Sequence, residues 1–168
     1  MSDDLDKLAA QVGAVLKAKG EKRARGAKSL LLATAESCTG GGIAEAITRI
    51  PGSSAWFDRA FVTYSNEAKV EMLGVESNAI DRYGEVSDAV VRQMAEGALA
   101  RSKAHLAVAV TGIAGPGGGT VDKPVGTVWF AWVVRDKSIV SERCVFKGDR
   151  AAIRHQTIVH ALTKLLHN

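Results

Sequence analysis

Apolar residues recur at intervals of three and four positions along several stretches of the chain, a spacing typical of helices that bury one face. The first predicted helix carries its apolar stripe from Leu5 to Leu16, and Gly20 is expected to end it. A second helix carries Ile43 and must stop before Pro51, because proline cannot continue a helix. Both segments therefore have one face to bury against the rest of the protein.

Polar residues that favour helix N-termini mark three further helices. Ser65 or Asn66 is expected to cap a short helix over residues 67–73, Ser87 a longer one, and Asp149 the last one in the chain. Each of these residues is followed by a stretch with apolar residues at helical spacing.

Short apolar and β-branched runs predict five strands. They span residues 30–36, 56–64, 105–110, 126–134 and 139–146. Only residues 135–138 separate the last two strands, a length that favours an antiparallel hairpin. Strands that alternate with helices predict a layered α/β domain, and the hairpin makes its sheet mixed, mostly parallel rather than wholly parallel.

The composition is that of one globular domain. The chain has 168 residues, of which 46% are hydrophobic, so it can build a core of its own but is short for two domains. We predict one domain over residues 1–168. The net charge of +4 comes largely from basic residues between Lys17 and Lys28, Arg25 among them, which we interpret as a solvated helix end and loop.

Other function classes find less support in the sequence. Aromatic residues make up only 5% of the chain and none lies among the basic residues at 17–28, so the stacking surfaces of nucleic-acid binders are missing. No apolar run approaches the roughly 20 residues that span a bilayer. Two cysteines and a start without an apolar leader favour a cytoplasmic protein without disulfides. We expect no nucleic-acid partner and no membrane association.

Candidate chemistry is densest where the strand over 30–36 ends. Ser37 leads into the glycines Gly40 to Gly42, after which a helix begins. Such a junction lets the backbone approach a ligand, and the unpaired N–H groups of the helix's first turn favour an anion there. Either a phosphate or a developing oxyanion would fit. Ser37 is a candidate nucleophile, but its hydroxyl needs a base from elsewhere.

Lys69 is the better candidate for that base. It lies one helical turn beyond the strand over 56–64, where its side chain can reach back over the strand ends, and burial could lower its pKa enough to accept a proton. Judged alone, Lys69 would be an ordinary surface lysine. None of the four histidines lies near a glycine loop or has zinc-ligand spacing, which disfavours a Ser-His-Asp triad and a metal site. They are His105, His155, His160 and His167.

The sequence allows more than one role for three residues near Ser37 and Lys69. Tyr64, at a strand end, can orient the lysine, donate a proton to a leaving amine, or simply pack. Glu36 can be an acid or an orienting group, but strand alternation points it away from Ser37. Cys38 should share the face of Glu36, so we interpret it as a small buried residue.

The glycine-rich loop over residues 111–120 is a second candidate binding element. Its backbone N–H groups and the Thr111 hydroxyl suit a phosphate, although the loop matches neither a P-loop nor a dinucleotide fingerprint. Lys123 beyond it can bring a positive charge to an anionic ligand. Because the loops at Ser37, Tyr64 and Thr111 all follow predicted strands, we expect them to form one pocket if those strands are parallel neighbours.

Three motifs in this order closely resemble the CinA C-terminal family. They are residues 35–41 (AESCTGG), 63–69 (TYSNEAK) with Leu73-Gly-Val, and 111–119 (TGIAGPGGG) with 123–128 (KPVGTV). The resemblance runs from about Leu5 to the last helix. It implies an α/β/α sandwich and a nicotinamide-nucleotide amidohydrolase, which converts nicotinamide mononucleotide to nicotinate mononucleotide and ammonia in pyridine-nucleotide salvage.

The resemblance also implies roles for individual residues. Ser37 would attack the carboxamide carbon, Lys69 would take its proton and Tyr64 would assist the transfer, with no cofactor and no metal. Backbone N–H groups near Gly40 and Gly41, or near Thr111 and Gly112, would hold the oxyanion. The remaining candidates for binding the ribose and phosphate are Thr39, Gly115, Gly117, Gly118 and Lys123.

Two departures from the family pattern and two alternative functions remain. Longer relatives carry an additional N-terminal domain, and Gly42 stands where a larger apolar residue is usual.

The main alternative is a non-catalytic nucleotide-binding module of the same fold, and the other is a basic adaptor for nucleic acid. We also expect Trp56 and Phe57 to be exposed, which would allow a homo-oligomer.

Overall fold

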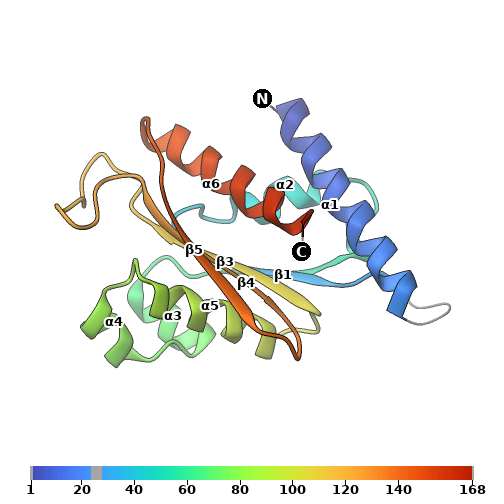
Figure 1. Ribbon diagram of the computed structural model, residues 1–168, viewed down its shortest axis with the longest axis horizontal. Coiled ribbons are helices and arrows are strands. Elements are labelled where there is room, and N and C mark those ends of the chain that lie inside the picture. The colour runs from blue at the N-terminus through green and yellow to red at the C-terminus, as the bar shows by residue number, and fades with distance from the viewer. Residues whose placement is uncertain (1, 24–27, 168) are drawn as a thin grey trace.

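The computed structural model describes residues 2–23 and 28–167, which form a sheet covered by helices on both faces (Figure 1). Within these residues the helices are α1 (Ser2–Arg23), α2 (Gly42–Thr48), α3 (Asn66–Leu73), α4 (Ser77–Tyr83), α5 (Asp88–Ala100) and α6 (Arg150–Leu165), with one 3-10 turn, η1 (Ser53–Ala55). The strands are β1 (Leu32–Glu36), β2 (Phe57–Val62), β3 (Leu106–Gly112), β4 (Thr127–Val134) and β5 (Ile139–Val145).

The sheet has the strand order β2-β1-β3-β4-β5. Strand β1 pairs in parallel with both β2 and β3, whereas β4 is antiparallel to β3 and to β5. Four of the five strands thus run in one direction and only β4 opposes them. The mixed, mostly parallel sheet and its terminal hairpin are confirmed.

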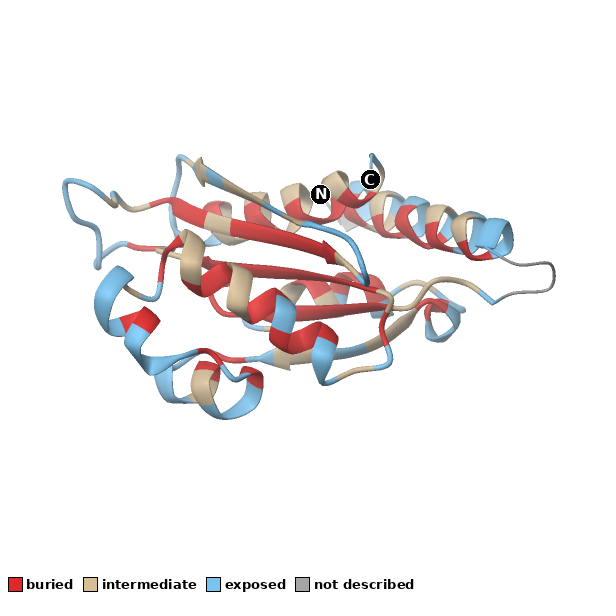
Figure 2. Cartoon of the chain, turned by 60° about the horizontal axis from the view of Figure 1, so that its bottom comes forward, coloured by how far each residue is buried: buried red, intermediate tan, exposed pale blue. Residues whose placement is uncertain are grey.

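Two helical layers complete the α/β/α sandwich. Helices α1, α2 and α6 contact one another on one face of the sheet, and α5 lies on the other face with α3 and α4 beside it. Successive side chains of β3 point to opposite faces of the sheet and so contribute to the cores under both helical layers. Leu106, Val108 and Val110 face the first layer, while Ala107 and Ala109 face α5. The small residues on that second face let α5 pack closely on the sheet. Burial follows the strands and the inward helix faces (Figure 2).

The predicted helix caps are present. The side chains of Ser65, Ser87 and Asp149 each accept a hydrogen bond from the backbone N–H three residues later. Gly74 adopts a left-handed conformation at the end of α3, with φ 71°. These caps fix where the helices nearest the strand ends begin and stop.

Two expectations were wrong, and one helix was not predicted. Gly20 does not end the first helix, which continues to Arg23; a glycine is required there because a Cβ would collide with the carbonyl oxygen of Lys28. The short helix α4 was not predicted, because its sequence lacks a clear apolar stripe. Trp56 is only 5% exposed and packs against Gly13 of α1, so the surface expected for self-association is not formed by its ring.

Two further outcomes concern the surface. Among the described residues, no helix combines the length and apolar character needed to cross a bilayer. The predicted basic segment lies partly outside the described residues, since Arg25 falls in the gap after α1.

Candidate active site

The carboxyl ends of β1, β2 and β3 meet at one edge of the sheet and open into a cavity of about 460 Å³. Ser37 follows β1, Tyr64 follows β2, and Thr111 lies near the end of β3; all three line this cavity. The prediction that the loops at these positions form one pocket is confirmed. Such edges are where ligands bind in open α/β sheets.

Two of the residues expected to carry chemistry are in direct contact. The Nζ atom of Lys69 lies 3.1 Å from Ser37 Oγ and 3.0 Å from the carbonyl oxygen of Tyr64. Lys69 reaches this position because Ser65 caps α3 and places the lysine on the turn that faces the end of β1. Lys69 is 1% exposed and Ser37 is 6% exposed. The pair is therefore shielded from solvent at the floor of the cavity.

Burial changes the acidity of the lysine. Removal from water lowers the pKa of Lys69 from its ordinary value, and the more distant carboxylates of Glu85 and Glu67 only partly oppose this. None of the ion pairs formed by the described residues includes Lys69. An amine with a lowered pKa in contact with a hydroxyl can accept that hydroxyl's proton.

Tyr64 is placed differently from the sequence expectation. Its backbone carbonyl accepts the hydrogen bond from Lys69, but its side chain is 64% exposed. The phenol oxygen instead accepts a hydrogen bond of 3.3 Å from Arg150 Nη2. The ring thus lies at the mouth of the cavity, and the backbone is what positions the lysine.

Glu36 organises the turn that presents Ser37. Its fully buried carboxylate accepts hydrogen bonds from the hydroxyls of Thr34 (3.0 Å) and Thr39 (2.6 Å) and from the backbone N–H groups of Ile43 (2.9 Å) and Ala44 (3.0 Å). The carboxylate therefore takes two donors of the first turn of α2, where a negative charge is favoured by the helix dipole. These donors are not available to a substrate.

The residues after Ser37 consequently contribute less to the cavity than expected. Thr39, Gly40 and Gly41 are not among the lining residues. The hydroxyl of Thr39 is bound to Glu36, and the backbone N–H of Gly40 donates to the carbonyl of Ser37 at 3.1 Å. Gly40 and Gly41 adopt left-handed conformations, with φ 59° and 97°, so their role in the structure is to form the tight turn.

Cys38 lies in the core as expected. It is 6% exposed and packs with the cluster beneath α1, α2 and α6, and it also lines the cavity beside Ser37. Burial raises the pKa of the Cys38 thiol to about 12, which keeps it protonated and a poor nucleophile. The Gly112 backbone passes close by, since a Cβ there would lie 3.2 Å from Cys38 Sγ.

The glycine-rich loop forms the opposite wall. Gly112, Gly115, Gly117 and Gly118 line the cavity, and the Thr111 hydroxyl donates to the carbonyl of Glu85 at 2.8 Å. This hydroxyl is thus used to join the loop to the segment before α5.

The cation at the cavity is not the expected one. Lys123 is not among the lining residues; its Nζ donates to the carbonyl of Tyr83 at 2.8 Å. Arg150, the first residue of α6, lines the cavity and donates to the carbonyl of Gly115 at 2.7 Å. Sequence reasoning missed Arg150 because this residue lies 86 positions after Tyr64 in the chain. Nothing in the local sequence around Arg150 indicates that it contacts Tyr64.

Histidines and metal-ligand clusters are absent from this cavity as far as the described residues go. His105, His155, His160 and His167 all lie elsewhere. One group of three metal-ligand side chains occurs in the described residues, Glu142 with Cys144 and His160, and it is on β5 and α6.

Comparison with known proteins connects this arrangement to one family. Residues 6–168 match the model of the CinA C-terminal domain. The nicotinamide-nucleotide amidohydrolase PncC of Enterobacter agglomerans is 51% identical over 162 residues, which cover 96% of this chain and 93% of the relative. The protein of the same name from Pseudomonas putida is 58% identical over 133 residues, covering 79% and 82%.

Solved structures agree with the sequence matches. The competence/damage inducible protein CihA of Agrobacterium tumefaciens superposes with a TM-score of 0.89 at 45% identity, covering 98% of this chain and 96% of that one. A competence damage-inducible protein A from Klebsiella pneumoniae gives a TM-score of 0.89 at 37% identity with the same coverage.

Proposed function

Because the chain belongs to the CinA C-terminal domain family, we propose that it is a nicotinamide-nucleotide amidohydrolase that uses Ser37 as nucleophile and Lys69 as base. It deamidates nicotinamide mononucleotide to nicotinate mononucleotide and ammonia. The observation that carries the proposal is the 3.1 Å contact between the buried Ser37 Oγ and Lys69 Nζ. Pyridine-nucleotide salvage in the cytoplasm is the setting in which we expect this reaction.

The proposed reaction has two halves. In the first, neutral Lys69 accepts the Ser37 proton while Oγ attacks the carboxamide carbon, and the resulting ammonium returns that proton to the departing ammonia. In the second, Lys69 takes a proton from water, the hydroxide attacks the acyl ester, and the proton returns to Ser37 as the carboxylate leaves. The Tyr64 carbonyl holds the amine throughout, since it accepts a hydrogen bond from either protonation state.

The cavity suits the nucleotide part of this substrate. Its volume of about 460 Å³ lies in the range of small-molecule sites. We assign the phosphate to Arg150, whose guanidinium is exposed at the mouth and can form paired hydrogen bonds to phosphate oxygens. The wall of Gly115, Gly117 and Gly118 allows the ribose to lie close to the backbone.

Ammonia release tests the proposal against the non-catalytic alternative. The purified chain should convert nicotinamide mononucleotide to nicotinate mononucleotide. A coupled assay would detect the ammonia released, and chromatography would detect the nicotinate mononucleotide formed. The Ser37→Ala variant should lose at least about 10³-fold in kcat while still binding the substrate in a titration calorimeter. Binding without turnover in the unaltered chain would indicate a nucleotide-binding module. Full turnover in Ser37→Ala would refute the serine mechanism.

A further inference from the structure

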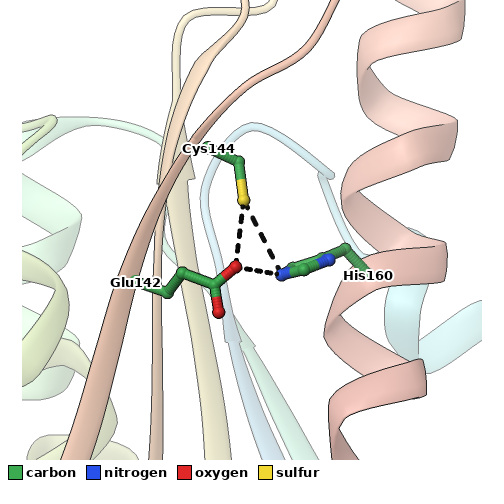
Figure 3. Close-up of side chains that lie close together, drawn as sticks. All are labelled: Glu142, Cys144 and His160. Carbon is green, nitrogen blue, oxygen red and sulfur yellow. Dashed lines mark hydrogen bonds and ion pairs between the residues drawn. The ribbon is translucent and has the colours of Figure 1, made fainter.

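A second group of reactive side chains lies between β5 and α6, away from the cavity (Figure 3). Glu142 and Cys144 are two residues apart on β5, so both project from the same side of this edge strand toward His160 of α6. All three side chains are partly buried. The proposed amidohydrolase reaction uses none of them.

The three ligand atoms converge on one another. Glu142 Oε1 lies 2.8 Å from His160 Nε2 and 3.3 Å from Cys144 Sγ, and Sγ lies 3.7 Å from the same Nε2. In a cysteine–histidine–acid catalytic triad the acid binds the histidine nitrogen that does not face the nucleophile. Here the thiol and the carboxylate share Nε2, so the group cannot relay a proton as a triad does.

The group instead offers one oxygen, one sulfur and one nitrogen atom that converge on a single point, with all three atoms within 4.8 Å of one another. Such a mixed set of donor atoms is typical of a metal site.

The spacing fits a tetrahedral zinc ion. With Zn–S bonds of about 2.3 Å and Zn–N and Zn–O bonds of about 2.1 Å, tetrahedral ligands stand about 3.6 Å apart for sulfur and nitrogen or oxygen, and about 3.4 Å apart for nitrogen and oxygen. The observed distances from Sγ, 3.3 and 3.7 Å, bracket the first value. Only the 2.8 Å separation of the carboxylate and imidazole must widen, which a small side-chain rotation achieves.

Neighbouring groups already hold two of the ligands in place. The His160 ring packs against Phe130 with ring centroids 4.7 Å apart, and against Phe146 at 6.1 Å. Lys164 Nζ binds Glu142 Oε2 at 3.1 Å, which leaves Oε1 as the oxygen that faces Cys144 and His160. Outer contacts of this kind orient metal ligands and are part of a functional site.

We propose that Glu142 Oε1, Cys144 Sγ and His160 Nε2 bind one Zn²⁺, with water as the fourth ligand. Cysteine and histidine together select zinc over the magnesium and calcium that oxygen ligands prefer. Binding exchanges the thiol proton for the metal, so the proton passes to solvent. The ion would tie the edge strand β5 to α6, whose first residue, Arg150, lines the cavity.

Cobalt titration of the purified, chelator-treated chain tests this site. Co²⁺ should bind one ion per chain and produce both the visible bands of a tetrahedral site and the near-ultraviolet band of a cobalt–thiolate bond. Added Zn²⁺ should abolish these bands and raise the midpoint of thermal unfolding. Cys144→Ala should lose the thiolate band, and His160→Gln should lose one-to-one binding.

The chain offers a matched control for each variant. Cys38→Ala removes the other cysteine, and His155→Gln removes another histidine of α6; both should keep the full cobalt spectrum. If the Cys144 or His160 variant fails to fold, labelling of the unaltered chain decides instead: Zn²⁺ should protect Cys144 from alkylation, as read by mass spectrometry. Absence of a thiolate band in the unaltered chain, or unchanged Cys144 labelling with Zn²⁺, would overturn the proposal.

Discussion

The buried carboxylate of Glu36 gives the sharpest quantitative prediction. The Glu36→Gln substitution keeps the shape of the side chain but replaces one acceptor oxygen with an NH₂ group. Whichever way the amide is turned, this group faces the backbone N–H of either Ile43 or Ala44, because each carboxylate oxygen now accepts from one of them. The threonine hydroxyls can rotate to accept from the amide, but a backbone N–H cannot.

The magnitude follows from the hydrogen bonds lost. One buried backbone N–H left without an acceptor costs about 1–3 kcal/mol, and each of the three remaining bonds loses about 1 kcal/mol when its acceptor is no longer charged. The neutral amide avoids the burial cost of a carboxylate, which offsets part of this sum. We expect the free energy of unfolding to fall by about 2–4 kcal/mol.

Urea unfolding followed by tryptophan fluorescence measures this change, and α2 provides a matched control. Glu45→Gln makes the same substitution at an exposed position paired with Arg49, where the expected loss is below about 0.5 kcal/mol. In Glu36→Gln, kcat should fall more than KM rises, because the loosened turn carries Ser37. If both variants lose the same stability, the four hydrogen bonds of Glu36 do not hold this turn together and the reasoning fails.

Three further substitutions test the site. Lys69→Met should abolish turnover yet stabilise the fold by about 1–4 kcal/mol near neutral pH, since folding no longer has to bury or deprotonate an ammonium group. Because the folded pKa of Lys69 lies below 10.5, this gain should be full below the folded pKa and vanish as pH rises to 10.5, as measured in a series of urea unfolding curves. Arg150→Gln should raise KM for the mononucleotide about 10- to 100-fold with little change in kcat in steady-state kinetics, and an unchanged KM would remove Arg150 from phosphate binding. Cys38→Ala should retain turnover within a few-fold and leave the pH–rate profile unaltered, because its thiol with a pKa of about 12 takes no part; a large loss of kcat would contradict this.

The fold was predictable because the spacing of apolar residues and the positions of capping and turn residues indicate the same elements along most of the chain. Alternation placed the strands, and Ser65, Ser87 and Asp149 marked helix starts through a local hydrogen bond that needs no tertiary information. The failure at Gly20 is tertiary in origin. Gly20 signals a helix end locally, but the neighbouring chain at Lys28 requires a glycine inside the helix.

The candidate site was predictable to the extent that it depends on strand ends. Parallel neighbours bring the loops after them together, so Ser37, Tyr64 and Thr111 met as expected. What local reasoning could not supply was the direction of individual side chains. The Glu36 carboxylate turns back onto the start of the next helix, α2, and Arg150 reaches a loop 35 residues away in sequence.

Three consecutive polar or reactive residues, Glu36, Ser37 and Cys38, show how the fold assigns chemistry by environment. Cys38 has the intrinsically stronger nucleophile, but burial raises the pKa of its thiol to about 12 and so withholds the thiolate. Ser37 has the weaker nucleophile, yet it alone contacts an amine whose pKa is lowered by burial. The Glu36 carboxylate accepts hydrogen bonds from the backbone N–H groups at the start of α2, and these bonds fix the turn between β1 and α2. Burial therefore has opposite consequences for the two groups, because it raises the pKa of the Cys38 thiol and lowers the pKa of the Lys69 amine. For this reason we expect the Ser37 hydroxyl to be the group that attacks.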